Sequence, residues 1–220
     1  MSRDRKQELA ANLQIVEEKI SAAIRRANRM REELTLVVVT KTYPIEDVQL
    51  LYELGVRHFG ENRDHEGALK APALPSDAQW HFQGQIQSRK IPSIASWAKT
   101  IHSLDSLDHA KKFADRGAGS HQFFLQVNCE DAAEHRGGVA ISEVDGFLQN
   151  APVLISGLMV VPPLQSDSSE IFKKIAAMGI KYSLPFLSMG MSGDYEIAIE
   201  EGATHIRVGS SILGSRPPVN

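Results

Sequence analysis

The first 31 residues carry a single apolar stripe with the period of an α-helix. Its members are Leu9, Leu13, Val16, Ile20 and Ile24, which follow one another at steps of four, three, four and four residues. Charged residues occupy positions between them, so one side of the segment is apolar and the other is polar. The spacing predicts an amphipathic helix over residues 5–31 whose apolar side packs against the rest of the protein.

At residue 34 the helical period gives way to a nearly continuous run of aliphatic and β-branched residues. Residues 34–40 read Leu-Thr-Leu-Val-Val-Val-Thr. A strand that is apolar on both sides is typical of a parallel sheet covered by helices. Pro44 suits the first turn of the helix that follows, and Gly55 suits its end.

The same unit of a strand followed by a helix repeats to the end of the chain. Strands are predicted over residues 34–40, 56–60, 79–82, 100–104, 122–128, 153–160, 185–188 and 204–208. The helices after them are predicted over residues 46–54, 61–70, 87–98, 106–116, 142–149, 168–178, 194–201 and 210–213. Such alternation predicts an α/β protein, a (β/α)8 TIM barrel with an additional N-terminal helix, in one domain over residues 1–220.

Composition narrows the functional classes. The 220 residues are 42% hydrophobic and 23% charged, with a formal net charge of −3, so nothing favours binding to nucleic acid or to an anionic membrane. No apolar stretch approaches the ~20 residues that span a bilayer, and the charged start is unlike a secretory signal. Cys129 is the only cysteine, which excludes an internal disulfide. We therefore expect a cytoplasmic protein.

Small and polar residues gather just past the last two predicted strands, at the end of a parallel barrel where active sites form. Ser188, Met189 and Gly190 precede one helix, and Gly209 and Ser210 open the last one. Loops after strands seven and eight often bind phosphate, because unpaired amides at a helix start carry partial positive charge and glycine permits close approach. This pattern predicts a phosphate site. The alternative is two ordinary turns with serine as N-cap.

Lys41 ends the most hydrophobic predicted strand. Desolvation at a barrel mouth would lower the pKa of its ammonium group, and the neutral amine is a nucleophile towards carbonyls. The alternative is a lysine that extends its charged end into solvent. An amine beside a phosphate site matches pyridoxal 5′-phosphate (PLP), which needs an amine for its aldehyde and amides for its phosphate.

Arg207 lies between the apolar Ile206 and Val208, so its side chain points to the opposite face of the last strand. A permanent cation there could donate a hydrogen bond to the nitrogen of an aromatic ring. The alternative is a structural ion pair with Glu61 or Asp105.

Other side chains give weaker signals. The eight histidines are scattered and lack the spacing of metal ligands, so we expect no metal site. His81 could line the pocket or pack within its strand. Cys129 has no evident histidine partner, and neither a Walker loop nor a nucleophile elbow occurs in the sequence.

Several motifs stand at the ends of the predicted strands. They are Val39-Thr-Lys-Thr-Tyr-Pro44, Phe59-Gly-Glu-Asn62, Trp80-His-Phe-Gln-Gly84, Gly157-Leu-Met159, Leu187-Ser-Met-Gly-Met-Ser-Gly-Asp194 and Val208-Gly-Ser-Ser-Ile-Leu-Gly214. With these motifs the chain, from its first helix to Gly214, resembles the YggS/PROSC family, the pyridoxal phosphate homeostasis proteins.

The resemblance implies a barrel like the N-terminal domain of alanine racemase, which holds PLP as an internal aldimine. It implies the following cofactor-binding residues: Lys41 as the Schiff-base lysine, Asn62 near the ring, Arg207 facing the pyridine nitrogen, and Ser188, Met189, Gly190, Gly209 and Ser210 around the phosphate. An arginine cannot take up a proton from the ring nitrogen, so the ring would stay unprotonated and withdraw electrons poorly.

The function implied is PLP homeostasis, in which the protein buffers the cofactor or delivers it to PLP-dependent apo-enzymes. We expect no robust catalysis, because racemases of this barrel type add a second β domain that supplies a catalytic tyrosine, and only six residues follow Gly214 here. We expect a monomer, because the sequence shows no exposed apolar stripe. The alternatives are a racemase or lyase of low activity and a phosphosugar-type barrel enzyme without PLP.

Three segments depart from the family pattern. Glu134-His-Arg-Gly-Gly138 stands where a Lys-x-Gly turn is usual, the stretch from Pro163 to Pro185 is shorter, and Ser210 stands where many members have threonine.

Overall fold

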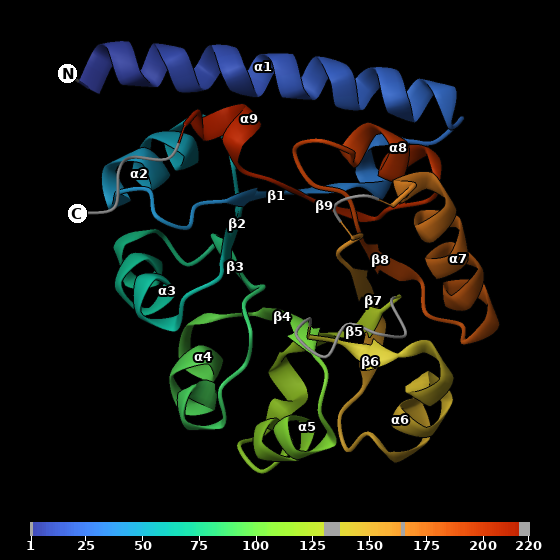
Figure 1. Ribbon diagram of the computed structural model, residues 1–220. Helices are drawn as coiled ribbons and strands as arrows, with labels where there is room; N and C mark the ends of the chain where they lie inside the picture. Colours follow the sequence, from blue (N-terminus) through green and yellow to red (C-terminus); the bar gives the residue numbers. More distant parts are fainter. Residues whose placement is uncertain (1, 130–136, 164–165, 216–220) are drawn as a thin grey trace.

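The structure, a computed structural model, describes residues 2–129, 137–163 and 166–215. In Figure 1 the strands form a ring with helices around its outside. The strands are β1 Thr35–Val39, β2 His58–Glu61, β3 Gln79–Phe82, β4 Thr100–Leu104, β5 Gln122–Asn128, β6 Val139–Ala140, β7 Ile155–Val160, β8 Phe186–Ser188 and β9 His205–Val208.

Nine α-helices lie in the described part of the chain. They are α1 Ser2–Arg26, α2 Ile45–Glu53, α3 Asp64–Lys70, α4 Ile91–Trp97, α5 Leu107–Ala114, α6 Val144–Asn150, α7 Ser168–Lys181, α8 Tyr195–Glu200 and α9 Ser210–Leu213. Short 3-10 helices occupy Arg31–Glu33, Ala71–Ala73, Ser88–Lys90, Ala118–Ser120 and Ile141–Glu143.

The ring is a closed parallel barrel. Its strand order is β1-β2-β3-β4-β5-β7-β8-β9, and β9 pairs with β1 through Thr35↔His205 and Val38↔Val208. This confirms the predicted (β/α)8 barrel. The short strand β6, which pairs with the last two residues of β5 in addition to these eight strands, was not predicted because two residues give no periodic signal.

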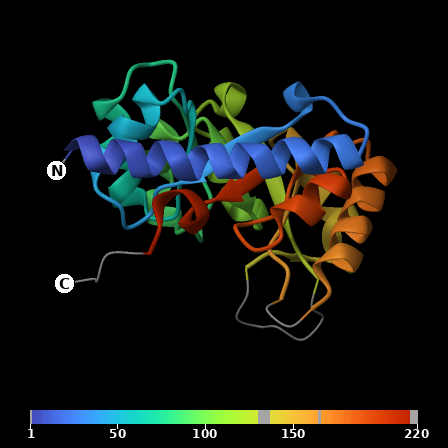
Figure 2. The ribbon, with the colours of Figure 1, turned by 90° about the horizontal axis from the view of Figure 1, so that it is seen from above.

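The long helix α1 lies outside the ring and contacts α2, α8 and α9 (Figures 1 and 2). The guanidinium of Arg5 donates to both carboxylate oxygens of Asp47 on α2, at 3.0 and 2.7 Å, and to the carbonyl of Leu213 at 2.9 Å. The amide of Asn12 donates to the carbonyl of Ile212 at 3.0 Å. Thus α1 holds together the two helices that follow β1 and β9.

The predicted end of this first helix at residue 31 is wrong, because the helix ends at Arg26. Asn28 adopts a left-handed φ of 52°. The amide of Arg29 donates to the carbonyl of Ile24, and that of Asn28 to the carbonyl of Arg25. These two bonds form a Schellman motif, and asparagine is tolerated at its left-handed position.

The inside of the ring is polar for a barrel of this type, which aliphatic side chains usually fill. Alternate residues of a strand point to opposite faces, and on β1 one such set, Leu36 and Val38, belongs to the main hydrophobic core. The imidazole of His102 on β4 lies 2.7 Å from the hydroxyl of Ser188 on β8. Because these strands are not neighbours in the closed ring, the contact crosses its interior. Arg207 on β9 is also buried there.

Within the described residues, none of the helices combines the length and the apolar character that crossing a bilayer requires.

A glycine on the barrel wall generates the first prediction. A Cβ added at Gly157 on β7 would lie 2.1 Å from the carbonyl oxygen of Phe186 on β8. A backbone oxygen within a strand cannot move aside as the end of a flexible side chain can. We therefore expect Gly157→Ala to destabilise the protein by about 1–3 kcal/mol, as overpacking does. Gly146→Ala is the matched control. A Cβ there meets nothing within 4 Å on the exposed side of α6, and helix propensity predicts a gain of about 0.5–1 kcal/mol. Urea unfolding measures both changes, and equal effects would contradict this packing.

Candidate functional site

A cavity of about 270 Å³ opens at the carboxyl end of the barrel, where β1, β2, β3, β7 and β9 end. Its lining residues are Val39, Lys41, Tyr43, Asn62, Gln83, Met159, Val161, Met191, Ser192, Gly193, Arg207, Gly209 and Ser210. Parallel barrels place their active sites at this end. The cavity therefore combines a lysine, an arginine, two amide side chains and two glycine-serine loops.

Lys41 reaches this cavity from a tight turn after β1. The amide of Tyr43 donates to the carbonyl of Thr40 at 3.1 Å, so Lys41 and Thr42 are the central residues of the turn. Thr42 has a φ of 70°, a conformation that β-branched residues rarely adopt. Such a conformation costs of order 1–3 kcal/mol and persists only when surrounding contacts impose it.

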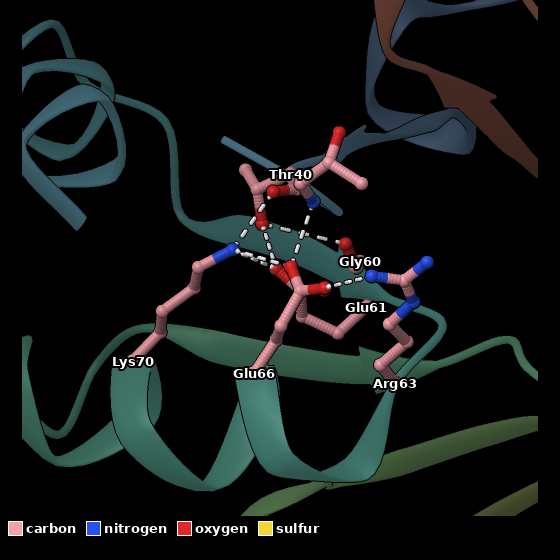
Figure 3. Close-up of polar contacts among 7 residues, drawn as sticks. Thr40, Gly60, Glu61, Arg63, Glu66 and Lys70 are labelled. Carbon is pink, nitrogen blue, oxygen red and sulfur yellow. Dashed lines mark hydrogen bonds and ion pairs between the residues drawn. The ribbon is translucent and has the colours of Figure 1, made fainter. Parts of the chain in front are cut away.

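Two acidic residues and one lysine supply those contacts (Figure 3). The buried ammonium group of Lys70 donates to Glu61 Oε1 at 2.7 Å, to the carbonyl of Thr40 at 2.8 Å and to Glu66 Oε2 at 3.2 Å. Glu66 Oε2 also accepts the amide of Thr42 at 2.7 Å. The residues on both sides of Lys41 are thus fixed from α3 and β2.

Burial raises the pKa of the Glu61 carboxyl group, and the neighbouring Lys70 and Thr40 oppose that effect. For Glu66 burial acts in the same direction, but the Thr42 amide and the Lys70 ammonium outweigh it and lower its pKa. Glu66 is therefore an anion at neutral pH, which suits it to accept the strained amide of Thr42.

Two amide side chains, those of Asn62 and Gln83, stand in the cavity wall. Asn62 Oδ1 and Gln83 Nε2 are buried and have no hydrogen-bond partner among the described residues. The backbone of Asn62 is fixed against Gly84, where an added Cβ would lie 1.9 Å from the Asn62 carbonyl oxygen. Buried polar atoms are normally satisfied. A polar ligand in the cavity would satisfy both.

The loops after β8 and β9 meet on another wall of the cavity. The amide of Gly209 donates to the hydroxyl of Ser192 at 3.3 Å, and the hydroxyl of Tyr43 donates to the carbonyl of Gly214 at 2.7 Å. A Cβ at Gly209 would lie 3.1 Å from the carbonyl oxygen of Val39. Glycine therefore lets the last loop lie close to the end of β1.

Arg207 lies at the base of the cavity and is almost fully buried. It pairs with neither Glu61 nor Asp105, the two partners considered from sequence. Its guanidinium donates to the hydroxyl of Ser188 and to the carbonyl of Val160, both at 2.8 Å. Burial lowers its pKa to about 10, partly opposed by Asp194, so it remains a cation at neutral pH.

The residues predicted from sequence divide into two groups. Those that line the cavity are Lys41, Asn62, Arg207, Gly209 and Ser210. The other three are not among its lining residues. Ser188 is buried and hydrogen-bonded to Arg207, Met189 is buried in the main hydrophobic core, and Gly190 has a φ of 90° and accepts the Arg207 amide on its carbonyl.

Sequence reasoning missed several lining residues next to those it found. Met191, Ser192 and Gly193 stand in the loop after β8 in place of the three residues before them, and Gln83 follows β3. Both segments directly follow predicted strands, and this position is the signal in the sequence that points to them. The turn at Glu134-His-Arg-Gly-Gly138 and the stretch after Pro163 lie partly outside the described residues.

Comparisons with known proteins agree over nearly the whole chain. The family model described as alanine racemase, N-terminal domain, matches residues 11–217. A pyridoxal phosphate homeostasis protein of Corynebacterium glutamicum is 38% identical over 219 residues, which cover 90% of this chain and 98% of that protein. A pyridoxal phosphate homeostasis protein of Mycobacterium tuberculosis is 34% identical over 245 residues, which cover 97% of this chain and 95% of that protein.

A solved structure shows the same fold with a ligand. PipY of Synechococcus elongatus with PLP bound is 31% identical to this chain, with a TM-score of 0.76. The similarity covers 94% of this chain and 100% of that one.

The support beneath the Lys41 turn generates the second prediction. Lys70→Met is expected to destabilise the protein by about 3–5 kcal/mol, because it leaves the Glu61 carboxylate buried without its cation. The double variant Lys70→Met/Glu61→Gln removes both charges of the Lys70–Glu61 pair and keeps an oxygen that can accept the hydroxyl of Thr40. We expect it to recover most of the loss, as measured by urea unfolding.

The pH dependence of the single variant has a definite sign. Without the Lys70 ammonium group, which opposes the effect of burial, the pKa of Glu61 in the folded state rises further. The folded state then binds the proton more tightly than the unfolded chain does. The free energy of unfolding of Lys70→Met should therefore rise as the pH falls towards the ordinary carboxyl pKa. A single variant as stable as the double variant at neutral pH would refute the role given to this ion pair.

Proposed function

The chain belongs to the family of pyridoxal phosphate homeostasis proteins, and on that premise we propose that it binds PLP in the cavity at the carboxyl end of its barrel and buffers or delivers the cofactor. The observation that carries this proposal is that Lys41, Gly209 and Ser210 line the same cavity. They come from opposite ends of the chain, and they offer an amine together with a phosphate-type loop.

The chemistry of the lining residues fits PLP. When bound, PLP supplies an aldehyde that condenses with amines, a polar aromatic ring and a phosphate dianion. Asn62 Oδ1 and Gln83 Nε2 are buried without partners among the described residues, and polar substituents on the ring of PLP would give them hydrogen-bond partners. Val39 and Met159 supply apolar surface in the same cavity.

Each polar group of the cavity has a role in holding the cofactor. Lys41 provides the amine that anchors the aldehyde, and the strained turn around it limits where that amine can lie. Ser192, Gly209 and Ser210 offer hydroxyl and backbone groups to the phosphate. Ser188, Met189 and Gly190 support this wall from beneath.

Arg207 bears on whether the protein is an enzyme. Its guanidinium has only donors, so it holds a ring nitrogen without giving up a proton to it. A ring without that proton withdraws electrons poorly, and carbanion chemistry on it is slow. This supports homeostasis over vigorous catalysis. A racemase or lyase of low activity remains the rival function.

The setting of this function is part of the proposal. The single half-buried cysteine, Cys129, suits a reducing compartment, and we take that compartment to be the cytoplasm. PLP-dependent apo-enzymes are the partners that would receive the cofactor from a monomer of this protein.

The third prediction tests covalent capture at Lys41. The purified protein with PLP should show the visible absorption of a Schiff base, and Lys41→Ala should lose it because no other amine lines the cavity among the described residues. Lys99→Ala is the control, since Lys99 is exposed just before β4, at the other end of the barrel. Mass spectrometry after borohydride reduction should find the phosphopyridoxyl group on Lys41. Its presence on Lys70 or on a surface lysine would overturn the site.

The fourth prediction separates homeostasis from catalysis. Chiral chromatography of amino acids incubated with the PLP-loaded protein should reveal no sustained racemisation, because Arg207 leaves the ring a weak electron sink. Turnover that persists over many cycles and disappears in Lys41→Ala would favour the enzyme instead.

A further inference from the structure

Four histidines that are scattered in the sequence meet inside the barrel. His58, His81, His102 and His205 come from β2, β3, β4 and β9. The ring of His205 lies 6.2 Å from that of His81 and 5.9 Å from that of His102, measured between centroids. In the part of the chain that the structure describes, no group of His, Cys, Asp or Glu is arranged to hold a metal ion. The cluster therefore needs another explanation.

Three of these imidazoles form a hydrogen-bonded series with Ser188. Nδ1 of His58 lies 3.0 Å from Nε2 of His81, and Nδ1 of His81 lies 2.8 Å from Nε2 of His102. Nδ1 of His102 lies 2.7 Å from the hydroxyl of Ser188, which accepts from Arg207 at 2.8 Å. The series thus begins at the candidate binding cavity and runs down the interior of the barrel.

The two ends of the series lie at different surfaces. Arg207 lines the cavity at the carboxyl end. His58 is half-buried and lines a separate groove with Glu17 and Arg57, near the amino end of the strands. His81 and His102 between them are buried, and the ring of His102 stacks on Phe124 at 4.6 Å with an interplanar angle of 4°. The stacking fixes the plane in which His102 can bond.

Arg207 sets the direction of every bond in the series. A guanidinium only donates, so the Ser188 oxygen accepts from Arg207 and its single proton is free to go to His102 Nδ1. His102 must then carry its own proton on Nε2 and donate it to His81 Nδ1. By the same logic His81 donates from Nε2 to His58 Nδ1. The opposite direction would leave the buried Ser188 proton without an acceptor among the described residues.

Electrostatics favours the same direction. No carboxylate lies within ion-pair distance of Arg207 among the described residues, so dipoles must stabilise its buried charge. In this direction each hydroxyl and imidazole turns its lone pair towards the guanidinium. Burial also lowers the pKa of His81 and His102 well below the ordinary value, and that of His205 to about 3, so these rings stay neutral.

We propose that His81 and His102 are positioning residues for Arg207, which they hold through Ser188 as one hydrogen-bond chain of fixed direction. The chain keeps the guanidinium charged without a carboxylate partner and leaves its remaining N–H groups to a ligand in the cavity. The importance of this for binding rests on the proposed function, whereas the direction of the chain does not.

The direction is tested on the protein without cofactor. Two-bond ¹H–¹⁵N correlation spectra report which imidazole nitrogen carries the proton. His81 and His102 should both show a protonated Nε2 and a bare Nδ1 across the pH range around the ordinary imidazole pKa of about 6.5. Exposed His65 provides the reference signal. A protonated Nδ1 on either buried ring, or an imidazolium, would overturn the proposal.

The positioning role is tested with a matched pair of variants. His102→Asn keeps a side-chain oxygen that can accept from Ser188, whereas His102→Leu keeps only bulk. Loss of a hydrogen bond in a chain that ends on a charged group should raise the Kd for PLP about tenfold in His102→Leu. His102→Asn should stay within about threefold of the wild type. A packing role alone predicts the reverse order, because an apolar leucine suits a buried site better than an amide does.

The possible outcomes remain distinct. Equal Kd values for His102→Leu and the wild type, or an asparagine variant as weak as the leucine variant, would refute the positioning role. If the wild type itself binds no PLP, the proposed function fails, and the spectra of the cofactor-free protein still decide the direction of the chain. Those spectra also decide it if His102→Leu does not fold.

Discussion

Closure of the parallel ring between β1 and β9 is the constraint on which the binding cavity depends. The register Val38↔Val208 places the residues that follow both strands at the same height on the rim. Lys41 and Gly209 thereby line one cavity, although almost the whole barrel separates them in the sequence. Helix α1 reinforces the closure from outside, because it is hydrogen-bonded to the helices that follow both strands.

The barrel stabilises two buried cations in opposite ways. Lys70 has the carboxylates of Glu61 and Glu66 beside it, and this charged group holds the strained turn that carries Lys41. Arg207 has only neutral partners among the described residues, a hydroxyl and a carbonyl. A paired cation is electrostatically satisfied and serves as support. A cation solvated by dipoles keeps its charge available to a ligand.

Local patterns were sufficient for the architecture. Short apolar runs and period-3.6 spacing identified all eight strands of the ring and the helices between them, because each strand is buried on both faces and each helix on one. The errors fall where the signal is short or conformational. Strand β6 has two residues, and the first helix ends early because Asn28 takes a left-handed conformation. The latter signal was present in the sequence, since asparagine is common at that position.

The sequence by itself determined which residues stand at the ends of strands, so it was sufficient to select Lys41, Arg207 and Gly209. Only the tertiary structure decided which neighbouring side chains turn into the cavity. Ser188 points to the interior, while the loop beyond it forms the wall. The same holds for His81 and His102, whose contact depends on how strands stagger around a closed ring. Stagger is a property of pairings between distant segments, and no local spacing encodes it.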